Sequence, residues 1–442
     1  MTYPSALRCA QLSDNAARYS AERFLDCIEP GLSMNAGIFV EQDRVLVTGE
    51  RIPEFVFPRA SDGWIFTMLQ TKKPGSYCRS FDDEFDIPLP SKSPLYTISG
   101  RHMVMMEGLL EIVFLLLARA EECFLEKRDP YGRFCFKDSF LCQWDAVDFP
   151  LIDEYAAIVR KGMGYPGKTT PKGRIIPTHD IDHLEVHFSD WIKEGAKDIL
   201  RRKNIRSAFC WLFSWLKYGT NKKYSPEVDG IRKLMRFSQE QKLVSHFYFL
   251  GGKTKEGWDD FYNLQESCWR TILQELHDAG CPCGFHASRL AFRDRYAFKE
   301  ELSQVRKAIP SFSDEVRQHY LCFDAAETPD IWEEAGLKAD YTLGFHDREG
   351  FRCGTCRPYP LFSLNRDCKL NILEHPLIVM ESTLQAYQKL NISESLDRIM
   401  NLKQRVMVHG GEFIILFHNS FIRNRTENWF RGMYCKVIQE EQ

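Results

Sequence analysis

The stretch from Arg174 to Asp182 reads RIIPTHDID, and it decides the fold of the larger part of the chain. Its apolar run leads into His179, Asp180 and Asp182. In an extended segment alternate side chains share one face, so the two carboxylates lie together. Because two carboxylates at this spacing repel each other, a cation or a shared proton has to offset their charge. The stretch predicts a buried strand that ends in a cation-binding pair, although aspartates are also common in solvated loops and helix caps.

Two other apolar runs also end in a histidine. GF at residues 284–285 leads to His286, and FIILF at residues 413–417 leads to His418. In a barrel of alternating strands and helices, the catalytic groups lie at the carboxyl ends of the strands. A neutral imidazole beside a carboxylate is a typical zinc environment, and a histidine at the last strand can protonate a leaving group. One such ending fits an ordinary core histidine, whereas three indicate a shared site.

Short apolar runs alternate with helical stretches from Arg174 onward. Strands are expected at Arg174–Thr178, Val244–Leu250, Cys283–His286, His319–Phe323, Tyr341–Phe345, Asn371–Met380 and Glu412–His418. Helices are expected between them, for example at Cys268–Ala279 and Phe298–Ala308. The alternation predicts βαβ units, and about seven or eight of them favour a closed barrel over an open sheet. We therefore expect a (β/α) barrel over residues 174–442.

The preceding residues, 1–165, form a smaller α/β domain in this interpretation. Strands are expected at Gly37–Val40 and Arg44–Val47, and helices at Met103–Ala120 and Leu151–Arg160. Acidic residues interrupt the first of these helices, which makes it a buried amphipathic helix rather than a membrane span. A stretch rich in glycine, proline and lysine then links this domain to the barrel.

The composition is that of a globular protein with a large core. The 442 residues are 44% hydrophobic and 27% charged, and the net charge of -3 argues against a nucleic-acid partner. The first residues, MTYPSALRCAQLSDN, lack the charged and apolar regions of a secretory signal. We therefore expect a cytoplasmic location, in which the 15 cysteines are mostly reduced thiols.

The segment 193–224 is both basic and aromatic. One interpretation is a pair of helices that covers one side of the barrel. The other is a surface that makes a peripheral contact with a membrane or holds a saccharide. We favour the first and keep the second open.

Three further residues have two interpretations each. Arg352 could pair with a catalytic base and orient it, or form a surface salt bridge. His319, which follows Arg317 and Gln318, opens the fourth expected strand, and a core role and a site role are equally open for it. Cys353 and Cys356 have the spacing of a redox pair, but no thioredoxin-like context surrounds them, so a structural role is favoured.

In chain order, these motifs resemble the polysaccharide deacetylase family (NodB homology). The resemblance is carried by THDID at 178–182, GFHAS at 284–288, FR at 351–352, LEHP at 373–376 and ILFH at 415–418. The first motif is similar to the Thr-His-Asp-Val-Asp of a bacterial subgroup that has an extra N-terminal domain. LLARAEE at 116–122 and DPYGRF at 129–134 are similar to the signature of that domain.

The resemblance implies a distorted (β/α)7 barrel that binds one divalent metal ion, usually Zn2+. It also implies hydrolysis of an N- or O-acetyl group on a sugar or glycan precursor. By motif, Asp180 resembles the general base, and Asp182 and His286 resemble metal ligands. Arg352 resembles the arginine that orients the base, and His418 resembles the general acid.

One position departs from the family pattern. Typical members carry a second histidine one helical turn after the first, so that both face the metal, and here that position is Leu290. His183 and His319 are the candidates for the third protein ligand, and Glu381 stands where an aspartate is usual. We expect a metal-dependent carbohydrate deacetylase. The alternatives are a catalytically inactive barrel that binds saccharide or a partner, and a deacylase that acts on a non-sugar amide.

Overall fold

The computed structural model describes residues 11–49, 52–61, 64, 68–69, 74–80, 85–89, 92–164, 171–186, 192, 196, 199–200, 205–251, 262–422 and 428–439. Contacts between Cα atoms divide the chain into two compact units, each discontinuous in sequence. Unit 1 comprises Met1–Arg174, Leu321–Ile378 and Asn401–Phe413, and unit 2 comprises Ile175–Tyr320, Val379–Met400 and Ile414–Gln442. The division into domains at residues 165 and 174 stays a prediction.

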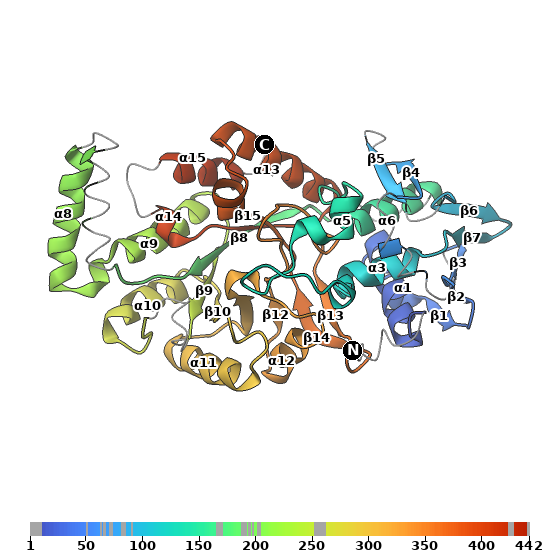
Figure 1. Ribbon diagram of the computed structural model, residues 1–442, viewed down its shortest axis with the longest axis horizontal. Helices are drawn as coiled ribbons and strands as arrows, with labels where there is room; N and C mark the ends of the chain where they lie inside the picture. The colour runs from blue at the N-terminus through green and yellow to red at the C-terminus, as the bar shows by residue number, and fades with distance from the viewer. Residues whose placement is uncertain are drawn as a thin grey trace. The chain divides into compact units, whose positions relative to one another are not determined.

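Unit 1 contains a five-stranded sheet in the order β1-β2-β3-β7-β6 (Figure 1). Only β3 and β7 pair in parallel, and helix α1 packs against α3 and α6. The strands of unit 1 are β1 (Gly37–Val40), β2 (Arg44–Thr48), β3 (Glu54–Pro58), β4 (Ser76–Arg79), β5 (Asp86–Leu89), β6 (Tyr96–Ser99), β7 (His102–Met105), β12 (Ala339–Asp340), β13 (Tyr359–Ser363) and β14 (Cys368–Glu374). Its helices are α1 (Asp14–Ile28), α3 (Leu109–Leu117), α4 (Glu121–Phe124), α5 (Phe140–Gln143), α6 (Leu151–Gly162) and α12 (Thr328–Glu334).

The stretch Met103–Ala120 is not the single helix that its sequence predicts. Met103 lies in β7, and α3 begins only at Leu109. Gly108 separates the two elements with a φ of +83°, a conformation that glycine adopts at little cost. The strands expected at residues 37–40 and 44–47 are confirmed as β1 and β2, and the helix expected at residues 151–160 is confirmed as α6.

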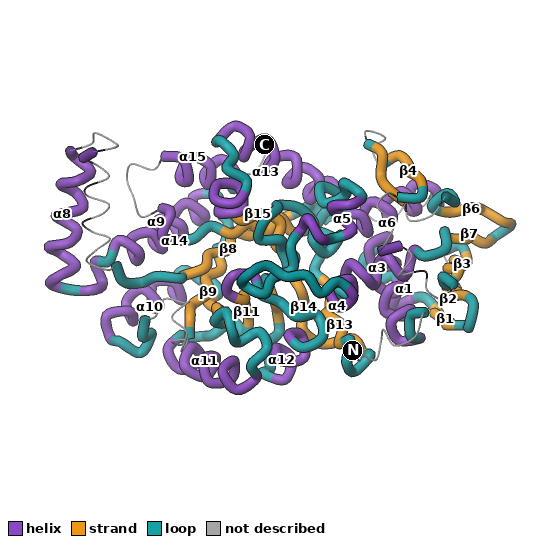
Figure 2. The backbone as a smooth tube through the Cα atoms, in the orientation of Figure 1, coloured by secondary structure: helices purple, strands orange, loops and turns teal. Residues whose placement is uncertain are grey.

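Unit 2 is built on four parallel strands in the order β8-β9-β10-β11, which Figure 2 shows in orange. Helices α8 and α9 connect β8 to β9, α10 connects β9 to β10, and α11 connects β10 to β11, so the predicted βαβ alternation is confirmed. These elements are β8 (Arg174–Ile181), α8 (Ile205–Thr220), α9 (Pro226–Glu240), β9 (His246–Leu250), α10 (Arg270–Asp278), β10 (Cys283–Ala287), α11 (Arg295–Ala308) and β11 (Glu315–Gln318). The later part of the chain adds α14 (Asn419–Ile422) and α15 (Asn428–Val437) to unit 2. Three further elements are divided between the two units: β15 (Leu377–Met380), α13 (Ile392–His409) and β16 (Glu412–Leu416).

Local sequence determines where two of these helices begin. The hydroxyl of Ser225 accepts the N–H of Glu227 at 3.3 Å, and Pro226 occupies the first position of α9. A serine cap followed by proline satisfies the exposed amide groups of a first helical turn. The Asp294 carboxylate caps α11 in the same way, accepting two backbone N–H groups at 3.0 Å.

The chain is a mixed α/β protein whose largest sheet has nine strands, in the order β13-β14-β12-β11-β10-β9-β8-β16-β15. The expected strand Asn371–Met380 is divided into β14 and β15 at His375 and Pro376, because proline has no amide hydrogen for the ladder. The expected strand Tyr341–Phe345 is wrong, since the Gly344 N–H donates to the nearby Thr342 carbonyl in a tight turn.

The strand expected to begin at His319 is not present in the structure. Strand β11 ends at Gln318, and His319 starts a 3-10 turn in which Tyr320 has a φ of +60°. A non-glycine residue in this region is strained, and such strain is common where a side chain has to be aimed. His319 therefore lies at the carboxyl end of β11. No helix among the described residues is long and apolar enough to span a membrane.

Candidate metal centre

Strand register brings the polar ends of β8, β10 and β11 together in unit 2. Ile181 in β8 lies level with Phe285 in β10, with one residue of β9 between them. The residues that follow, Asp182 and His286, therefore reach the same carboxyl edge of the sheet. On the other side of β10, Arg317 pairs with His286. Side chains from three strands can meet at this point.

Gly284 allows these strands to approach closely. A Cβ atom at this position would lie 2.8 Å from the backbone oxygen of Glu315 and 2.9 Å from the ring of Tyr248. Any larger residue would push β10 away from β9 and β11. Because His286 is two residues further along the strand, Gly284 helps to determine where that imidazole lies.

Asp182, His286 and His319 form a cluster whose ligand atoms all lie within 4.8 Å of one another. Oδ1 of Asp182 is 3.2 Å from Nε2 of His286 and 3.7 Å from Nε2 of His319. Bonds of about 2.0–2.2 Å to a tetrahedral zinc ion place neighbouring ligand atoms roughly 3.3–3.6 Å apart. The spacing of the cluster is thus close to what one divalent ion requires.

Two of these ligand atoms are buried without a hydrogen-bond partner in the part of the chain that the structure describes, namely Oδ1 of Asp182 and Nε2 of His286. Nδ1 of His286 donates to the backbone oxygen of Arg317 at 2.8 Å, so Nε2 carries the lone pair of the neutral imidazole. Burial lowers the pKa of His286, but the neighbouring carboxylates of Asp180 and Asp182 outweigh it and raise that pKa overall. The site therefore attracts a cation, and its donor set fits a divalent metal.

Asp180, the expected base, lies beside this cluster and beside an arginine. Its Oδ2 is 3.7 Å from Nε2 of His286, and its Oδ1 is 3.6 Å from Nη1 of Arg317. Nη2 of Arg317 donates to the hydroxyl of Thr178 at 2.9 Å, and the guanidinium lies over the ring of Tyr248. Arg317 was not among the expected site residues. Its position two residues before His319 was the available signal, since alternate residues of an extended segment share one face.

Arg352, which the family motif suggests for this role, has its own partners within unit 1. Its Nη2 donates to Glu122 at 2.6 Å, and its Nη1 donates to the backbone oxygen of Gly344 at 2.9 Å. Arg119 donates to the same Glu122 oxygen at 3.0 Å. Burial raises the pKa of Glu122, but the two guanidinium groups outweigh it and lower that pKa overall. The orienting role of Arg352 stays a prediction, and the guanidinium that the structure places beside Asp180 is that of Arg317.

His418 lies two residues after the end of β16 and faces the cluster of Asp182, His286 and His319. Its Nε2 is 3.6 Å from Oδ2 of Asp182, and its Nδ1 is hydrogen-bonded to the buried carboxylate of Glu381. Burial disfavours the imidazolium, but Glu381 and Asp182 outweigh it and raise the pKa of His418 to about 10. This shift favours the protonated imidazole, the form that a general acid needs before it acts.

Of the two candidates for the third ligand, the structure brings only His319 into the cluster. Among the described residues, His183 belongs to no three-ligand group, and its backbone oxygen accepts the Asn419 amide at 2.9 Å. Leu290 lies in a turn after β10 rather than in a helix. The loop after β11 therefore carries the histidine that the motif after β10 lacks.

His179 of the first motif is turned into the core rather than toward the cluster. Its Nδ1 donates to the backbone oxygen of Phe417 at 2.8 Å, and its Nε2 lies 3.2 Å from the hydroxyl of Ser245 and 3.3 Å from that of Tyr434. Burial lowers the pKa of His179 to about 3. His179 thus joins β8 to neighbouring elements as a neutral residue.

Part of the basic and aromatic segment 193–224 lies outside the described residues. Within α8, several large apolar side chains are exposed: Phe209, Leu212, Phe213, Trp215 and Leu216. Lys222 is held by Glu185 at 2.7 Å and by Glu266 at 2.9 Å. A membrane or saccharide contact through this segment stays a prediction.

Comparisons with known proteins cover parts of the chain. A family of unknown function (DUF7033) matches residues 76–164. No curated protein matches the chain. Among solved structures, the chain is similar to a crystal structure from Mycobacterium smegmatis that is provisionally described as a polysaccharide deacetylase, with 13% sequence identity and a TM-score of 0.38. That similarity covers 62% of this chain and 85% of the other. Because the sequence identity and the TM-score are this low, the function has to be argued from the residues of the site.

Proposed function

We propose that the protein is a metal-dependent hydrolase that removes an N- or O-linked acetyl group from a sugar or glycan precursor. The proposed scaffold is a distorted (β/α)7 barrel accompanied by a smaller N-terminal α/β domain. One observation carries the proposal: Asp182, His286 and His319 converge next to a second carboxylate, Asp180, and a carboxylate-paired histidine, His418. A ligand set, a base and an acid at one strand edge are the groups that acyl hydrolysis needs.

Asp182, His286 and His319 would hold the ion. When bound, a divalent metal, most simply Zn2+ with these ligands, would polarise the acyl carbonyl and make the attacking water more acidic. Zinc sites with three protein ligands are typically catalytic, whereas structural zinc sites usually have four. Because His319 is near enough to act as the third ligand, Leu290 no longer favours the inactive barrel.

The remaining residues move protons. Asp180 accepts a proton from the attacking water, and Arg317 holds that carboxylate in position. The water oxygen forms a bond to the acyl carbon, and the bond from that carbon to the nitrogen or oxygen of the sugar then breaks. His418 donates its proton to the departing nitrogen or oxygen, so the products are acetate and the free amine or hydroxyl. Glu381 accepts a hydrogen bond from Nδ1 of His418 and so favours the protonated imidazole before this step.

The test is the release of acetate from acetylated oligosaccharides, measured with zinc and after chelation. We expect Asp182→Asn to lose the zinc ion of this centre together with the activity. Asp180→Asn should keep zinc and lose about 10²–10⁴-fold in kcat, the usual contribution of a general base. The exposed Asp278→Asn on α10 is the matched control and should behave like the wild type.

Two outcomes would contradict the proposal. A wild-type protein that binds no metal at this centre in excess zinc would remove its basis. A protein that binds zinc and acetylated oligosaccharides but releases no acetate from any of them would favour the saccharide-binding alternative.

A further inference from the structure

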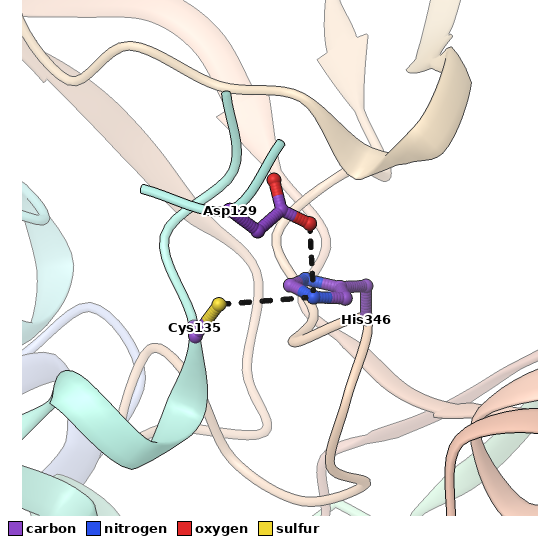
Figure 3. Close-up of side chains that lie close together, drawn as sticks. All are labelled: Asp129, Cys135 and His346. Carbon is purple, nitrogen blue, oxygen red and sulfur yellow. Dashed lines mark hydrogen bonds and ion pairs between the residues drawn. The ribbon is translucent and has the colours of Figure 1, made fainter. Parts of the chain in front are cut away.

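Unit 1 contains a second cluster of metal-ligating side chains, formed by Asp129, Cys135 and His346. Figure 3 shows the carboxylate and the thiol both directed at the same ring nitrogen of His346. Nε2 of His346 is 3.5 Å from Oδ2 of Asp129 and 4.0 Å from Sγ of Cys135. Asp129 and Cys135 belong to the segment that matches the family of unknown function, whereas His346 comes from a distant part of the sequence.

The three atoms have the chemistry and spacing of a zinc site. Thiolate, imidazole and carboxylate are the three side-chain groups that bind Zn2+ in proteins, with bonds of about 2.0–2.3 Å. Tetrahedral geometry at those lengths separates neighbouring ligand atoms by roughly 3.3–3.6 Å. The Asp129–His346 distance already agrees with this value. The Cys135–His346 distance exceeds it by only a few tenths of an ångström.

Hydrogen bonds fix the carboxylate of Asp129 before any ion arrives. Oδ1 accepts the backbone N–H groups of Tyr131 and Arg133 at 2.9 and 2.8 Å. Oδ2 accepts Nε of Arg133 at 2.8 Å and faces the cluster. Carboxylates that bind metals are usually held by such outer hydrogen bonds, which orient the ligand atom.

The other two ligands are also held in place by their sequence neighbours. The backbone N–H of Phe136, next to Cys135, donates to the Asp347 carboxylate at 3.0 Å, and Asp347 is next to His346. The rings of Phe136 and Phe345 pack edge to face at a centroid distance of 5.5 Å. These contacts join the two chain segments on either side of the thiol–imidazole pair, so the cluster is preorganised.

A catalytic relay of thiol, imidazole and carboxylate does not fit this arrangement. Such a relay needs the carboxylate at one ring nitrogen and the thiol at the other. Here Asp129 and Cys135 both approach Nε2 of His346. Convergence of three ligand atoms at one point is what a metal ion requires.

We propose that Asp129, Cys135 and His346 bind a zinc ion that fastens the segment matched by the family of unknown function to the segment around residue 346. Binding would release the thiol proton of Cys135 and form a Zn–S bond, while the carboxylate and Nε2 supply the other two ligands. The site is distinct from the proposed deacetylase centre, which contains no cysteine. Neither proposal depends on the other.

Cobalt substitution tests this site, because a thiolate bound to Co2+ gives an ultraviolet charge-transfer band that nitrogen and oxygen ligands do not. We expect the wild-type chain to show this band on titration with Co2+. Cys135→Ser should abolish the band, and Cys142→Ser, seven residues away in α5, should keep it. Asp182→Asn, which alters the other centre, should also keep it. X-ray absorption of the zinc-loaded wild type should show one sulfur ligand and requires no variant.

The numbers of bound ions separate the two centres. Wild-type protein should bind two zinc ions per chain, and either Cys135→Ser or Asp182→Asn should bind one. Absence of a thiolate band and of zinc–sulfur scattering in the wild type would overturn the proposal. Persistence of the band in Cys135→Ser would also overturn it, since another cysteine would then be the ligand.

Discussion

One carboxylate oxygen of Glu381 accepts two hydrogen bonds from His418, from the backbone N–H at 3.2 Å and from Nδ1 at 2.5 Å. Glu381 is completely buried, so solvent does not compete for this oxygen. The pair fixes the imidazole with Nε2 directed toward Asp182, 3.6 Å away. Glu381 stands where an aspartate is usual in the family that the motifs resemble, and the longer side chain still reaches the histidine.

Replacement of Glu381 should change the pH dependence of catalysis. A general acid acts in its protonated form, so activity falls as pH rises through its pKa. Glu381 raises the pKa of His418, and Glu381→Gln should therefore lower that pKa and move the alkaline limb of kcat/KM to lower pH. We expect kcat to fall about 10–100-fold at neutral pH. Glu381→Asp should restore most of the limb, and an unchanged limb in Glu381→Gln would show that Glu381 does not act through His418.

His319 and His183 should differ in their effect on metal affinity. His319→Ala removes a ligand of the cluster, so zinc affinity measured by competition with a chelator should fall by more than about 100-fold. His183→Ala should change it by less than about threefold. If the two results are reversed, the ligand comes from the loop after β8, and the observed position of His319 has another purpose.

Arg317 and Arg352 should have separable roles. Arg317→Met should lower kcat about 10–100-fold while zinc stays bound, because Asp180 loses its charged neighbour. Arg352→Met should instead lower the free energy of unfolding by about 3–5 kcal/mol, because it breaks a buried pair with Glu122. Denaturant unfolding measures the free energy of unfolding of each variant, and steady-state kinetics of the folded protein measure its kcat. If Arg352→Met lowers kcat without lowering the free energy of unfolding, Arg352 is the arginine that orients Asp180.

His179 should make stability depend on pH. Burial lowers its folded-state pKa to about 3, against about 6.5 in an unfolded chain. A depressed pKa means that the full stabilisation is present above pH ~6.5 and is lost as the pH falls toward about 3. Between pH 7 and 4.5 this loss is roughly 3 kcal/mol. His179→Asn should have a lower free energy of unfolding than the wild type at pH 7. Between pH 7 and 4.5 its free energy of unfolding should fall by less than that of the wild type. Equal falls in the variant and the wild type would exclude this contribution of His179.

The exposed apolar side chains of α8 allow a test of the membrane interpretation. With basic residues nearby in the sequence, they should bind vesicles that contain anionic lipids, and binding should weaken with salt. Replacement of Phe213 and Leu216 by serine should reduce co-sedimentation by at least about tenfold. Wild-type protein that stays in the supernatant would contradict the membrane interpretation and leave the helical pair and the saccharide-holding surface as the alternatives.

Local patterns predicted much of the fold. The apolar runs that lead to Asp180, His286 and His418 are strands β8, β10 and β16, because buried parallel strands need continuous apolar residues. Breaks at single residues were harder to predict. Gly108 and Pro376 divide stretches that read as continuous, since one backbone angle or one missing amide hydrogen outweighs the hydrophobicity of the neighbours.

The candidate site also has one part that local sequence predicts and one part that depends on tertiary contacts. RIIPTHDID predicts a buried strand with two carboxylates on one face from local spacing alone. Which histidine joins Asp182 and His286, and which arginine stands beside Asp180, depended on the register of β11 and on the strained turn at Tyr320. These residues are more than 100 positions from Asp182 in the sequence, and strand pairing and chain reversal bring them together. No local pattern carries that information, because it arises from contacts between distant segments.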